Sequence, residues 1–151
     1  MAQTLTNINL HVVFSTKDRA RTLDQKIRPR LCSYIAKTLE NRGAHVYMVN
    51  GGLDHLHLLY QQPVDQAISD LVRDVKSSSS RWIHETFPRQ RSFAWQRGYS
   101  AFSVSRSKLD AVYRYVARQE EHHRRVTFED ELVSLLKKHE LEFNEKYLWT
   151  P

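Results

Sequence analysis

Two strand-like segments, HVYMVN at 45–50 and LDHLHLLY at 53–60, meet around the sequence NGG at 50–52. Asparagine followed by glycine between two apolar runs is a strong β-hairpin signal, because both residues tolerate the positive φ angles of a tight turn. The chain is therefore expected to contain an antiparallel strand pair, and the elements around this pair determine the fold class.

The segments on both sides of this hairpin alternate between strand and helix patterns. Residues 6–15 alternate apolar and polar side chains, which predicts a half-buried strand. Apolar residues at helical spacing predict helices over 24–41, with Asp24 as a cap, and over 64–87. The second helix includes the serines at 77–80, because apolar residues beyond them continue its stripe.

The last third of the chain adds a strand and two helices. Residues 93–105 are aromatic and β-branched, which predicts a fourth strand, and a helix is expected over 107–123 before a final one. Both helices open on a capping-box pattern, Ser107 with Asp110 and Thr127 with Asp130. The order β-α-β-β-α-β plus two helices predicts an α+β, ferredoxin-like fold, with two helices on one face of a four-stranded antiparallel sheet.

Size and charge limit the class of protein. A chain of 151 residues is expected to form a single domain over 1–151, and its one cysteine, Cys32, cannot form an internal disulfide. No apolar run approaches membrane length, so we expect a cytoplasmic protein without a membrane partner. The net charge of +6 favours a polyanionic partner, most often nucleic acid.

Two histidines interrupt the apolar run of the second hairpin strand. Because side chains alternate along a strand, His55 and His57 share a face with Leu59, and Leu58 points the other way. Two neighbouring imidazoles can hold one divalent metal, and they can equally be polar residues on a solvated sheet surface. The fold places His11 of the first strand beside them, on the face away from the two core helices.

The helix expected over 107–123 faces this pair. Tyr115 and Gln119 are four residues apart, so they lie on the same helix face, and His122 extends the row. An apolar stripe beside them would dock the helix. Tyr113 is the rival tyrosine, but it lacks a glutamine four residues later and points to another side of the helix. The stripe consists of Leu109, Val112 and Val116.

These residue types suit phosphate chemistry. A metal held by two neutral imidazoles and an amide keeps positions open for a phosphate oxygen. Tyrosine, with an ordinary pKa of about 10, is a poor nucleophile at neutral pH, and a metal helps by polarising the phosphate. A tyrosine that attacks phosphate conserves the bond energy as phosphotyrosine, so a cut strand can later be rejoined.

At this point the chain resembles a known family. HLH at 55–57 matches its His-hydrophobic-His motif and YVARQ at 115–119 its Tyr-x-x-x-Gln motif. Further blocks are similar at 14–19, 95–105, 119–124 and 147–149. The chain looks like the single-tyrosine transposases of the HUH nuclease class, which move insertion sequences as single-stranded DNA, with the REP-associated tyrosine transposases as close relatives.

The resemblance implies a function and a site. Members bind subterminal DNA hairpins, use Mg²⁺ or Mn²⁺, and cut and rejoin single-stranded DNA through a 5′-phosphotyrosine. They work as homodimers whose active sites are shared between protomers. Carried over to this chain, His55, His57 and Gln119 become metal ligands and Tyr115 the nucleophile. The clusters of basic residues add candidate phosphate contacts, namely Lys17, Arg19, Arg73, Lys76 and Arg81.

Several alternatives stay open. The protein can be a domesticated relative that processes repeated palindromes, or a non-catalytic binder of hairpin or single-stranded DNA. A small metal-dependent RNA-processing nuclease would not need Tyr115. His122 and His123 are expected to be solvated helix-end residues rather than functional ones. A metallo-β-lactamase-type site is excluded, because its motif needs an acid where this chain has Leu59.

Overall fold

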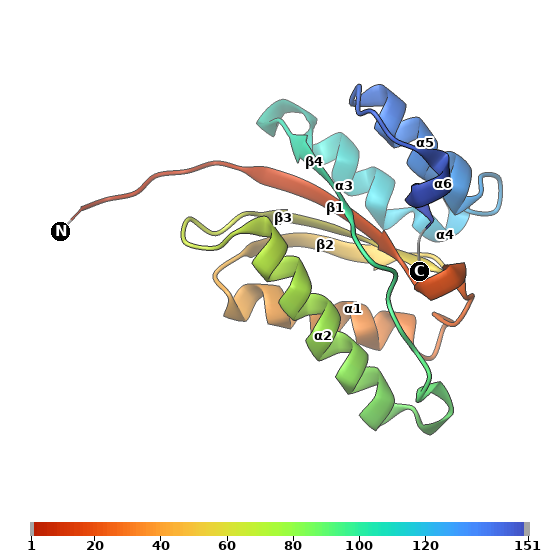
Figure 1. Cartoon of the computed structure of the whole chain (residues 1–151). Coiled ribbons are helices and arrows are strands. Elements are labelled where there is room, and N and C mark those ends of the chain that lie inside the picture. The colour runs from red at the N-terminus through yellow and green to blue at the C-terminus, as the bar shows by residue number, and fades with distance from the viewer. Residues whose placement is uncertain (1, 150–151) are drawn as a thin grey trace.

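A four-stranded antiparallel sheet with the strand order β2-β3-β1-β4 forms the centre of the molecule (Figure 1). The structure is a computed structural model and describes residues 2–149. The order is that of the split βαβ arrangement, so the predicted α+β, ferredoxin-like fold is confirmed. The single-domain prediction over 1–151 extends to residues 1 and 150–151, which lie outside the described part. The strands are β1 (Asn9–Ser15), β2 (His45–Gly51), β3 (His55–Gln61) and β4 (Ser100–Val104).

The hairpin of β2 and β3 forms around the predicted turn. Gly51 lies so close to β3 that a Cβ atom there would be 2.1 Å from the backbone oxygen of His55, so no larger residue fits. In the register between β1 and β3, Val12 pairs with Leu58 and Val13 with His57. The two residues of each strand thus face opposite sides of the sheet.

Helices α1 (Arg28–Asn41) and α2 (Ile68–Thr86) cover the face of Leu58 and form the main apolar core with it (Figure 1). The serines at 77–80 lie inside α2, as predicted. Asp24 caps the turn before α1, where its side chain accepts hydrogen bonds from the backbone nitrogens of Lys26 and Ile27 at 2.9 and 3.1 Å. Fully buried residues of this core include Val12, Phe14, Leu31, Ile35, Leu56, Leu58, Leu71 and Ile83.

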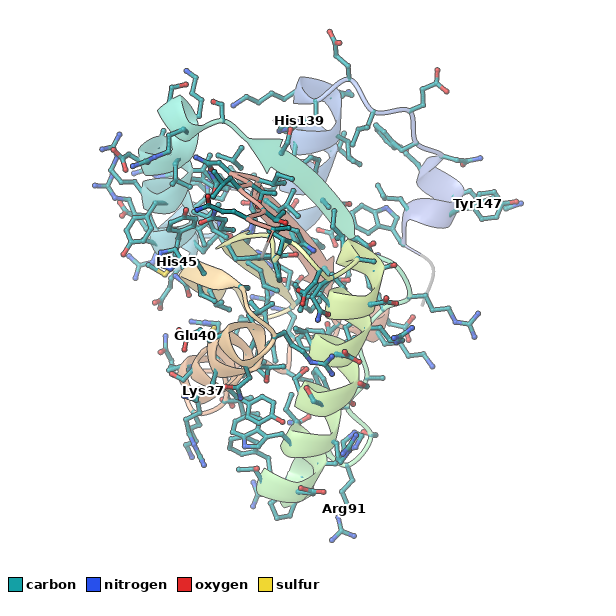
Figure 2. All side chains as sticks on the ribbon, turned by 90° about the vertical axis from the view of Figure 1, so that its left-hand side faces the viewer. Lys37, Glu40, His45, Arg91, His139 and Tyr147 are labelled. Atoms are coloured by element: carbon teal, nitrogen blue, oxygen red, sulfur yellow. The ribbon has the colours of Figure 1, made fainter. Side chains whose placement is uncertain are left out.

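The C-terminal helices cover the opposite face of the sheet. Figure 2 shows His139, just after α5, and Tyr147 on α6 in the half of the molecule away from Lys37 and Glu40 of α1. Apolar contacts anchor this layer, among them Phe128 and Leu132 of α5 against Val13 and Phe102. These helices are α3 (Leu109–Ala117), α4 (Gln119–His122), α5 (Phe128–Lys138) and α6 (Glu145–Leu148). Short 3₁₀ turns lie at Lys17–Arg19, Pro88–Gln90 and Arg106–Lys108.

The fourth strand is shorter than predicted. Only Ser100–Val104 pairs with β1, and the residues before it form a loop that touches the sheet through one bridge between Thr16 and Trp95. The aromatic residues that suggested a strand pack into the core instead. The ring of Trp95 meets that of Phe14 edge-on, with the ring centroids 4.9 Å apart.

The helix predicted over 107–123 is also different in two respects. It opens without the expected capping box, because no side chain caps its first turn and Ser107 instead contacts the hydroxyl of Ser105 at 3.1 Å. It is interrupted at Arg118, whose φ of −102° and ψ of 23° separate α3 from α4. The capping box at Thr127 does open α5 as predicted, with the Asp130 nitrogen donating to the Thr127 hydroxyl at 3.2 Å.

Candidate functional site

Two buried histidines of β3 lie at the centre of a polar cluster between the sheet and the C-terminal helices. His55 and His57 are both fully buried, and their ring centroids are 5.1 Å apart. Gly52 leaves room for this arrangement, since a Cβ atom there would lie 2.7 Å from the His55 ring. The alternative that these histidines lie on a solvated sheet surface is therefore wrong.

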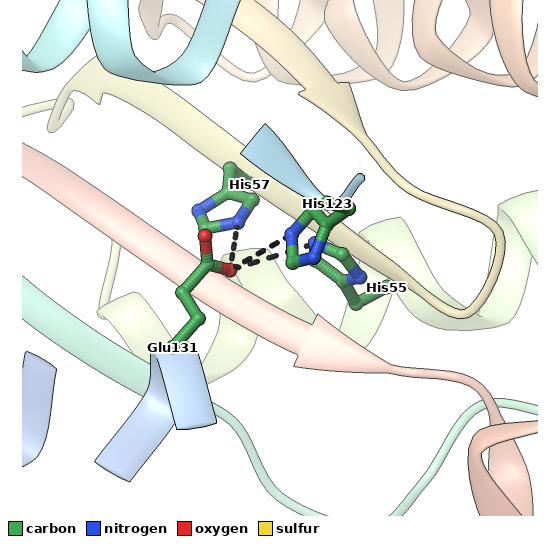
Figure 3. Close-up of side chains that lie close together, drawn as sticks. All are labelled: His55, His57, His123 and Glu131. Atoms are coloured by element: carbon green, nitrogen blue, oxygen red, sulfur yellow. Dashed lines mark hydrogen bonds and ion pairs between the residues drawn. The ribbon is translucent and has the colours of Figure 1, made fainter. Parts of the chain in front are cut away.

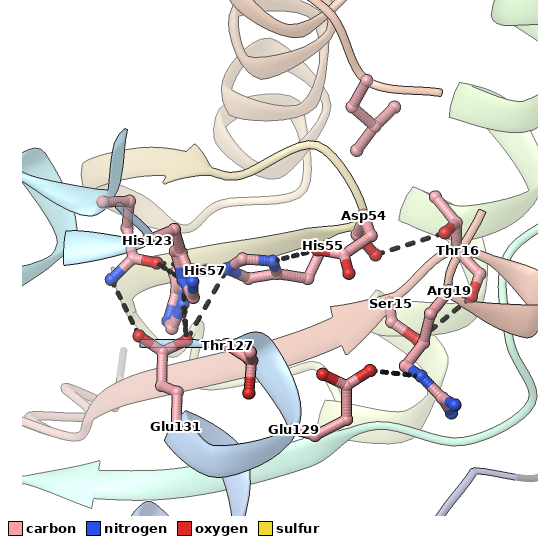
Figure 4. A network of polar contacts seen from close by, with 12 residues as sticks. Ser15, Thr16, Arg19, Asp54, His55, His57, His123, Thr127, Glu129 and Glu131 are labelled. Atoms are coloured by element: carbon pink, nitrogen blue, oxygen red, sulfur yellow. Dashed lines mark hydrogen bonds and ion pairs between the residues drawn. The ribbon is translucent and has the colours of Figure 1, made fainter. Parts of the chain in front are cut away.

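A second polar group orients each of the two rings. Nδ1 of His55 lies 2.8 Å from the Asp54 carboxylate (Figure 4). Nδ1 of His57 lies 2.7 Å from Nε2 of His11. Both rings consequently turn Nε2 toward the same space. Metal-ligating histidines are usually oriented by such a hydrogen bond on their other ring nitrogen.

Burial keeps two of the imidazoles neutral. It lowers the pKa of His57 to about 4, against the opposing effect of the hydrogen bond to Glu131. Burial and the neighbouring His57 together hold the pKa of His11 well below its ordinary value. Neutral imidazole is the form that binds metals. Neutral His11 can also either donate to or accept from Nδ1 of His57, so it does not fix that ring in one tautomer.

Helix α3 docks on the sheet beside the histidines. Leu109 and Val112 pack against the cluster around Leu59, as the predicted apolar stripe requires. The side chain of Asn50 donates to the backbone oxygens of Val116 and Ala117 at 3.1 and 3.2 Å. The end of α3 is thus tied to β2 of the same chain.

This docking brings the predicted nucleophile and the predicted amide ligand to the histidines. Gln119 is fully buried, and its Oε1 lies 3.1 Å from Nε2 of His55. The ring centroids of Tyr115 and His57 are 5.8 Å apart. Tyr113, the rival tyrosine, is 41% exposed. All four residues predicted as ligands and nucleophile therefore meet within one chain.

Glu131 of α5 lies in the middle of this group and was not predicted. It is only 3% exposed. Its Oε1 lies 2.9 Å from Nε2 of His57 and 3.6 Å from Nε2 of His55 (Figure 3). Its Oε2 accepts hydrogen bonds from the Tyr115 hydroxyl and, at 3.3 Å, from the Gln119 amide. One carboxylate thus connects the imidazoles with the tyrosine.

The sequence did carry a signal for this glutamate. Phe128, Leu132 and Leu136 form the buried stripe of α5, and Glu131 lies within that stripe. Glutamate is almost never fully buried unless it is paired. An acid inside an apolar helical stripe therefore points to a buried partner, although not to which one.

The cluster strongly perturbs the ionisation of its acid and its phenol. Burial alone would raise the pKa of Glu131, but hydrogen bonds from His123, His57 and Tyr115 hold it well below its usual range. Burial raises the pKa of Tyr115, and the Glu131 carboxylate beside it raises that pKa further. Tyr115 is therefore a neutral donor to an ionised carboxylate.

The histidine pair at the end of α4 also faces Glu131, so the expectation of solvated helix-end residues is wrong. Nε2 of His122 lies 2.9 Å from Oε2 of Glu131. Nε2 of His123 lies 3.3 Å from Oε1 of Glu131 and 2.8 Å from Oε1 of Gln119, while its Nδ1 donates to the backbone oxygen of Val126 at 2.8 Å. Burial lowers the pKa of His123, but the interactions with Glu131 outweigh it and raise that pKa overall.

The donor atoms suit a divalent cation. Ligand atoms of His55, His57, His123 and Glu131 all lie within 4.8 Å of one another. Mg²⁺ prefers oxygen ligands, whereas imidazole nitrogens favour the transition metals. A set that mixes imidazole nitrogens with the oxygens of Glu131 and Gln119 therefore fits a divalent metal, and fits Mn²⁺ better than Mg²⁺.

The five basic residues predicted to contact DNA have different surroundings. Lys17 and Arg81 are exposed, and Arg73 is exposed beside Asp70, with a nitrogen–oxygen distance of 3.3 Å. Arg19 contacts Glu129 at 2.5 Å and lies over the ring of Trp149 (Figure 4 shows Arg19 with Glu129).

Lys76 has a role inside the fold instead. Its ammonium donates to the backbone oxygens of Gln96, at 3.0 Å, and of Gly98. Burial lowers its pKa to about 8. The side chain therefore ties α2 to the loop before β4, which leaves it less free to bind a phosphate than the prediction assumed.

Two clefts flank the buried cluster. One of about 640 Å³ reaches His123 and Asp54, and both basic side chains, such as Arg124, and acidic ones, such as Glu120, line it. The other, of about 470 Å³, opens on Tyr115 and is lined by His122 and the arginines Arg114, Arg118 and Arg125. Guanidinium groups match phosphate geometry, so Tyr115 lies between a buried carboxylate and a phosphate-compatible pocket.

Comparisons with known proteins agree on one family. The family model described as "Transposase IS200 like" matches residues 4–119. The transposase of insertion sequence element IS200 from Salmonella typhimurium is 27% identical over 113 residues, which cover 71% of this chain and 74% of that protein. The ISDra2 transposase TnpA of Deinococcus radiodurans is 23% identical over 117 residues, 74% of this chain and 84% of that one.

Solved structures share the fold. A candidate transposase from Deinococcus radiodurans superposes with a TM-score of 0.65 at 20% identity, covering 80% of this chain and 96% of that chain. A REP-associated tyrosine transposase bound to a REP hairpin superposes with a TM-score of 0.61 at 13% identity, covering 95% of this chain and 90% of that chain.

Among residues 2–149, no helix combines the length and the apolar character needed to span a bilayer.

Proposed function

Since this chain belongs to the IS200-like transposases, whose family model covers residues 4–119, we propose that it cuts and rejoins single-stranded DNA next to hairpins. Tyr115 is the nucleophile in this proposal. His55, His57 and Gln119 hold a divalent metal, either Mg²⁺ or Mn²⁺. The observation that carries the proposal is the convergence of a tyrosine hydroxyl with a buried imidazole pair, the Tyr115 and His57 rings being 5.8 Å apart.

The cutting step transfers a DNA phosphate to the protein. The Tyr115 oxygen attacks phosphorus, the bond from phosphorus to the 3′-oxygen breaks, and the departing oxygen takes up a proton from solvent to become a 3′-hydroxyl. The phenolic proton passes to Oε2 of Glu131, which already accepts a hydrogen bond from this hydroxyl. A divalent metal held by His55, His57 and Gln119 would polarise the phosphate and offset the charge that develops on it.

Rejoining is the reverse step with a different DNA end. A 3′-hydroxyl attacks the 5′-phosphotyrosine and releases its proton to solvent. The bond between phosphorus and the Tyr115 oxygen breaks, and this oxygen recovers its proton from Oε2 of Glu131. The bond energy is kept in the phosphotyrosine, so no nucleotide cofactor is needed.

Charge and a structural relative support hairpin DNA as the substrate. The chain carries a net charge of +6, and arginines line the cleft on which Tyr115 opens. A solved REP-associated tyrosine transposase with this fold is described as bound to a REP hairpin. Lys17, Arg19, Arg73 and Arg81 stay candidate phosphate contacts.

DNA binding should depend strongly on salt. The logarithm of the binding constant should fall linearly with the logarithm of the salt concentration, with a slope of about −0.7 per phosphate neutralised on single strands.

The predicted homodimer with shared sites belongs to the same proposal. The residues of one chain already bring Tyr115 to His57, so the geometry also supports a site complete within one protomer. Mixing His57→Ala protomers with Tyr115→Phe protomers separates the two arrangements. Recovered cleavage supports sites shared across a dimer, and no recovery supports a site formed by each chain alone.

The proposal is tested with a labelled single-stranded oligonucleotide that carries a hairpin, in the presence of Mn²⁺. Wild-type protein should form a covalent adduct, visible as a slow band on a denaturing gel. Tyr115→Phe should abolish the adduct, while Tyr113→Phe, an exposed change on the same helix, should keep it.

The other outcomes each contradict the proposal in a different way. Nicking without an adduct would mean that water is the nucleophile and that the protein is a metal-dependent nuclease. Hairpin binding without any cleavage by the wild type would identify a non-catalytic binding protein. An adduct formed by Tyr115→Phe would move the nucleophile to another residue, with Tyr113 the first to test.

A further inference from the structure

The proposed reaction uses only one oxygen of the Glu131 carboxylate. Oε2 accepts the hydroxyl of Tyr115, whereas Oε1 points to the opposite side of the group. There it faces imidazole nitrogens only a short distance away. Oε1 lies 2.9 Å from Nε2 of His57, 3.3 Å from Nε2 of His123 and 3.6 Å from Nε2 of His55 (Figure 3).

His123 is oriented in the same way as the two histidines of β3. Its Nδ1 donates to the backbone oxygen of Val126, so its Nε2 is directed into the cluster. Asp54 and His11 have this role for His55 and His57. Metal-ligating histidines typically donate a hydrogen bond from one ring nitrogen and direct the other ring nitrogen at the metal.

We propose that Glu131 and His123 are further ligands of the metal, and that Glu131 links it to Tyr115 by giving Oε1 to the metal and keeping Oε2 on the tyrosine hydroxyl. This inference rests on the function proposed above. Both residues lie beyond the stretch 4–119 that the family model matches, so it assigns a new role to the C-terminal helices. Helix α5 is then part of the metal site and not merely a cover for the sheet.

The donor count is consistent with this assignment. His55, His57, His123, Glu131 and Gln119 direct two oxygens and three nitrogens into one space. Mn²⁺ commonly takes octahedral coordination, so one position would stay open for an oxygen of the DNA phosphate. A ligand that also holds the nucleophile fixes the distance between the phosphate and the attacking oxygen, which is what in-line transfer requires.

Metal affinity tests the inference without any DNA or cleavage. Isothermal titration of the full chain with Mn²⁺ should give one site. Glu131→Gln keeps the shape of the side chain but removes its charge, and it should weaken binding by at least about tenfold, since loss of even an outer contact of a metal ligand costs roughly 10–100-fold. His123→Asn should weaken binding to a similar degree.

Glu129→Gln is the matched control. It makes the same chemical change on the same turn of α5, at a side chain that is 40% exposed and contacts Arg19 instead of the cluster. Its affinity for Mn²⁺ should equal that of the wild type. A wild-type affinity in Glu131→Gln would overturn the inference for that residue, and in His123→Asn for the other.

X-ray absorption of the Mn²⁺-loaded protein separates a ligand from a residue that only orients ligands. The wild type should show three imidazoles, and His123→Asn two. Three imidazoles in His123→Asn, or two in the wild type, would mean that His123 does not bind the metal. For Glu131→Gln, an unchanged oxygen shell with weaker binding would assign the glutamate an orienting role and contradict the proposal.

Two further measurements keep the outcomes distinct. Thermal unfolding in a chelator shows whether Glu131→Gln is folded without metal. If Glu131→Gln is unfolded, the tests use Glu131→Asp, which keeps the charge but has a shorter side chain. If the wild type forms the tyrosine adduct while Glu131→Gln binds Mn²⁺ normally, only this inference fails. If the wild type neither binds Mn²⁺ nor forms an adduct, the proposed function fails with it.

Discussion

His57 and Leu58 are neighbours in the sequence and equally buried, yet they belong to two very different halves of the molecule. Leu58 points into the apolar core with α1 and α2, and His57 into the polar cluster beneath α3, α4 and α5. At these two residues, both faces of the sheet are buried. They differ in what holds them closed.

The apolar face depends on contacts that have no direction. Burial of apolar area stabilises it in proportion to the area, so side chains of similar size can replace one another there at modest cost. The polar face depends on partners for individual atoms, because a buried polar group without one costs about 1–3 kcal/mol. The first face therefore sets the stability of the fold, and the second restricts which residues can carry the chemistry.

The largest expected effect comes from breaking the polar face with His57→Ala. The substitution removes one metal ligand and the partner of Glu131 Oε1. Mn²⁺ affinity should fall by more than the roughly 10–100-fold seen when an outer contact of a ligand is lost, and the DNA adduct should disappear. Titration calorimetry and a denaturing gel measure the two effects. His45→Ala, an exposed histidine on β2, should leave both unchanged.

The matching change on the apolar face is Leu58→Ala, one residue further along β3. It leaves a cavity in a core that has no exposed surface at this point, so the free energy of unfolding should fall by about 2–5 kcal/mol. Denaturant unfolding in a chelator measures the loss. The Mn²⁺ affinity of the folded protein should match that of the wild type. A large drop in that affinity would mean that the two faces are not independent.

The same comparison explains what the sequence could predict. The apolar face follows from periodicity, since residues such as Ile35 or Leu71 repeat at the spacing of their helix. The order of helices and strands read in this way is enough to predict the fold class. The faces of His55 and Leu58 follow from alternation along one strand. That Tyr115 and Gln119 lie on the same helix face follows from their spacing of four residues.

The rest depends on contacts between segments that are distant in sequence. Nothing in the spacing of α5 shows that Glu131 reaches His57, which is 74 residues away. The break at Arg118 could not be predicted either, because a helical pattern continues through it. Trp95 belongs to an aromatic segment that was predicted to be a strand, but it lies in a loop and packs its ring against Phe14. Local patterns thus predict elements and faces, but not which polar atoms meet.

Adding and removing Mn²⁺ tests whether the metal stabilises the fold through the polar face alone. A ligand present at 100 times its dissociation constant stabilises the folded state by about 2.7 kcal/mol. Excess Mn²⁺ should therefore raise the melting temperature of the wild type and of Leu58→Ala, and a chelator should abolish the gain. His57→Ala, whose affinity for Mn²⁺ is expected to be far lower, should show a much smaller gain. An equal gain in His57→Ala would place the metal elsewhere in the protein.

The smallest effect is expected at the cap of the helix that supplies Glu131. The Thr127 hydroxyl accepts a hydrogen bond from the Asp130 nitrogen at 3.2 Å, and Thr127→Ala should lower the free energy of unfolding by about 1 kcal/mol. Thr127→Ser keeps the hydroxyl and should lose much less. Denaturant unfolding of the two variants measures the difference.

Thr127→Ala should change Mn²⁺ affinity little, because Phe128, Leu132 and Leu136 still hold α5 against the sheet. Apolar packing then positions the helix, and the carboxylate of Glu131 alone accounts for its part in the metal site. If Thr127→Ala weakens Mn²⁺ binding as much as Glu131→Gln, the position of α5 and not its carboxylate controls the site. The polar face would then depend on the helix cap as strongly as on its ligands.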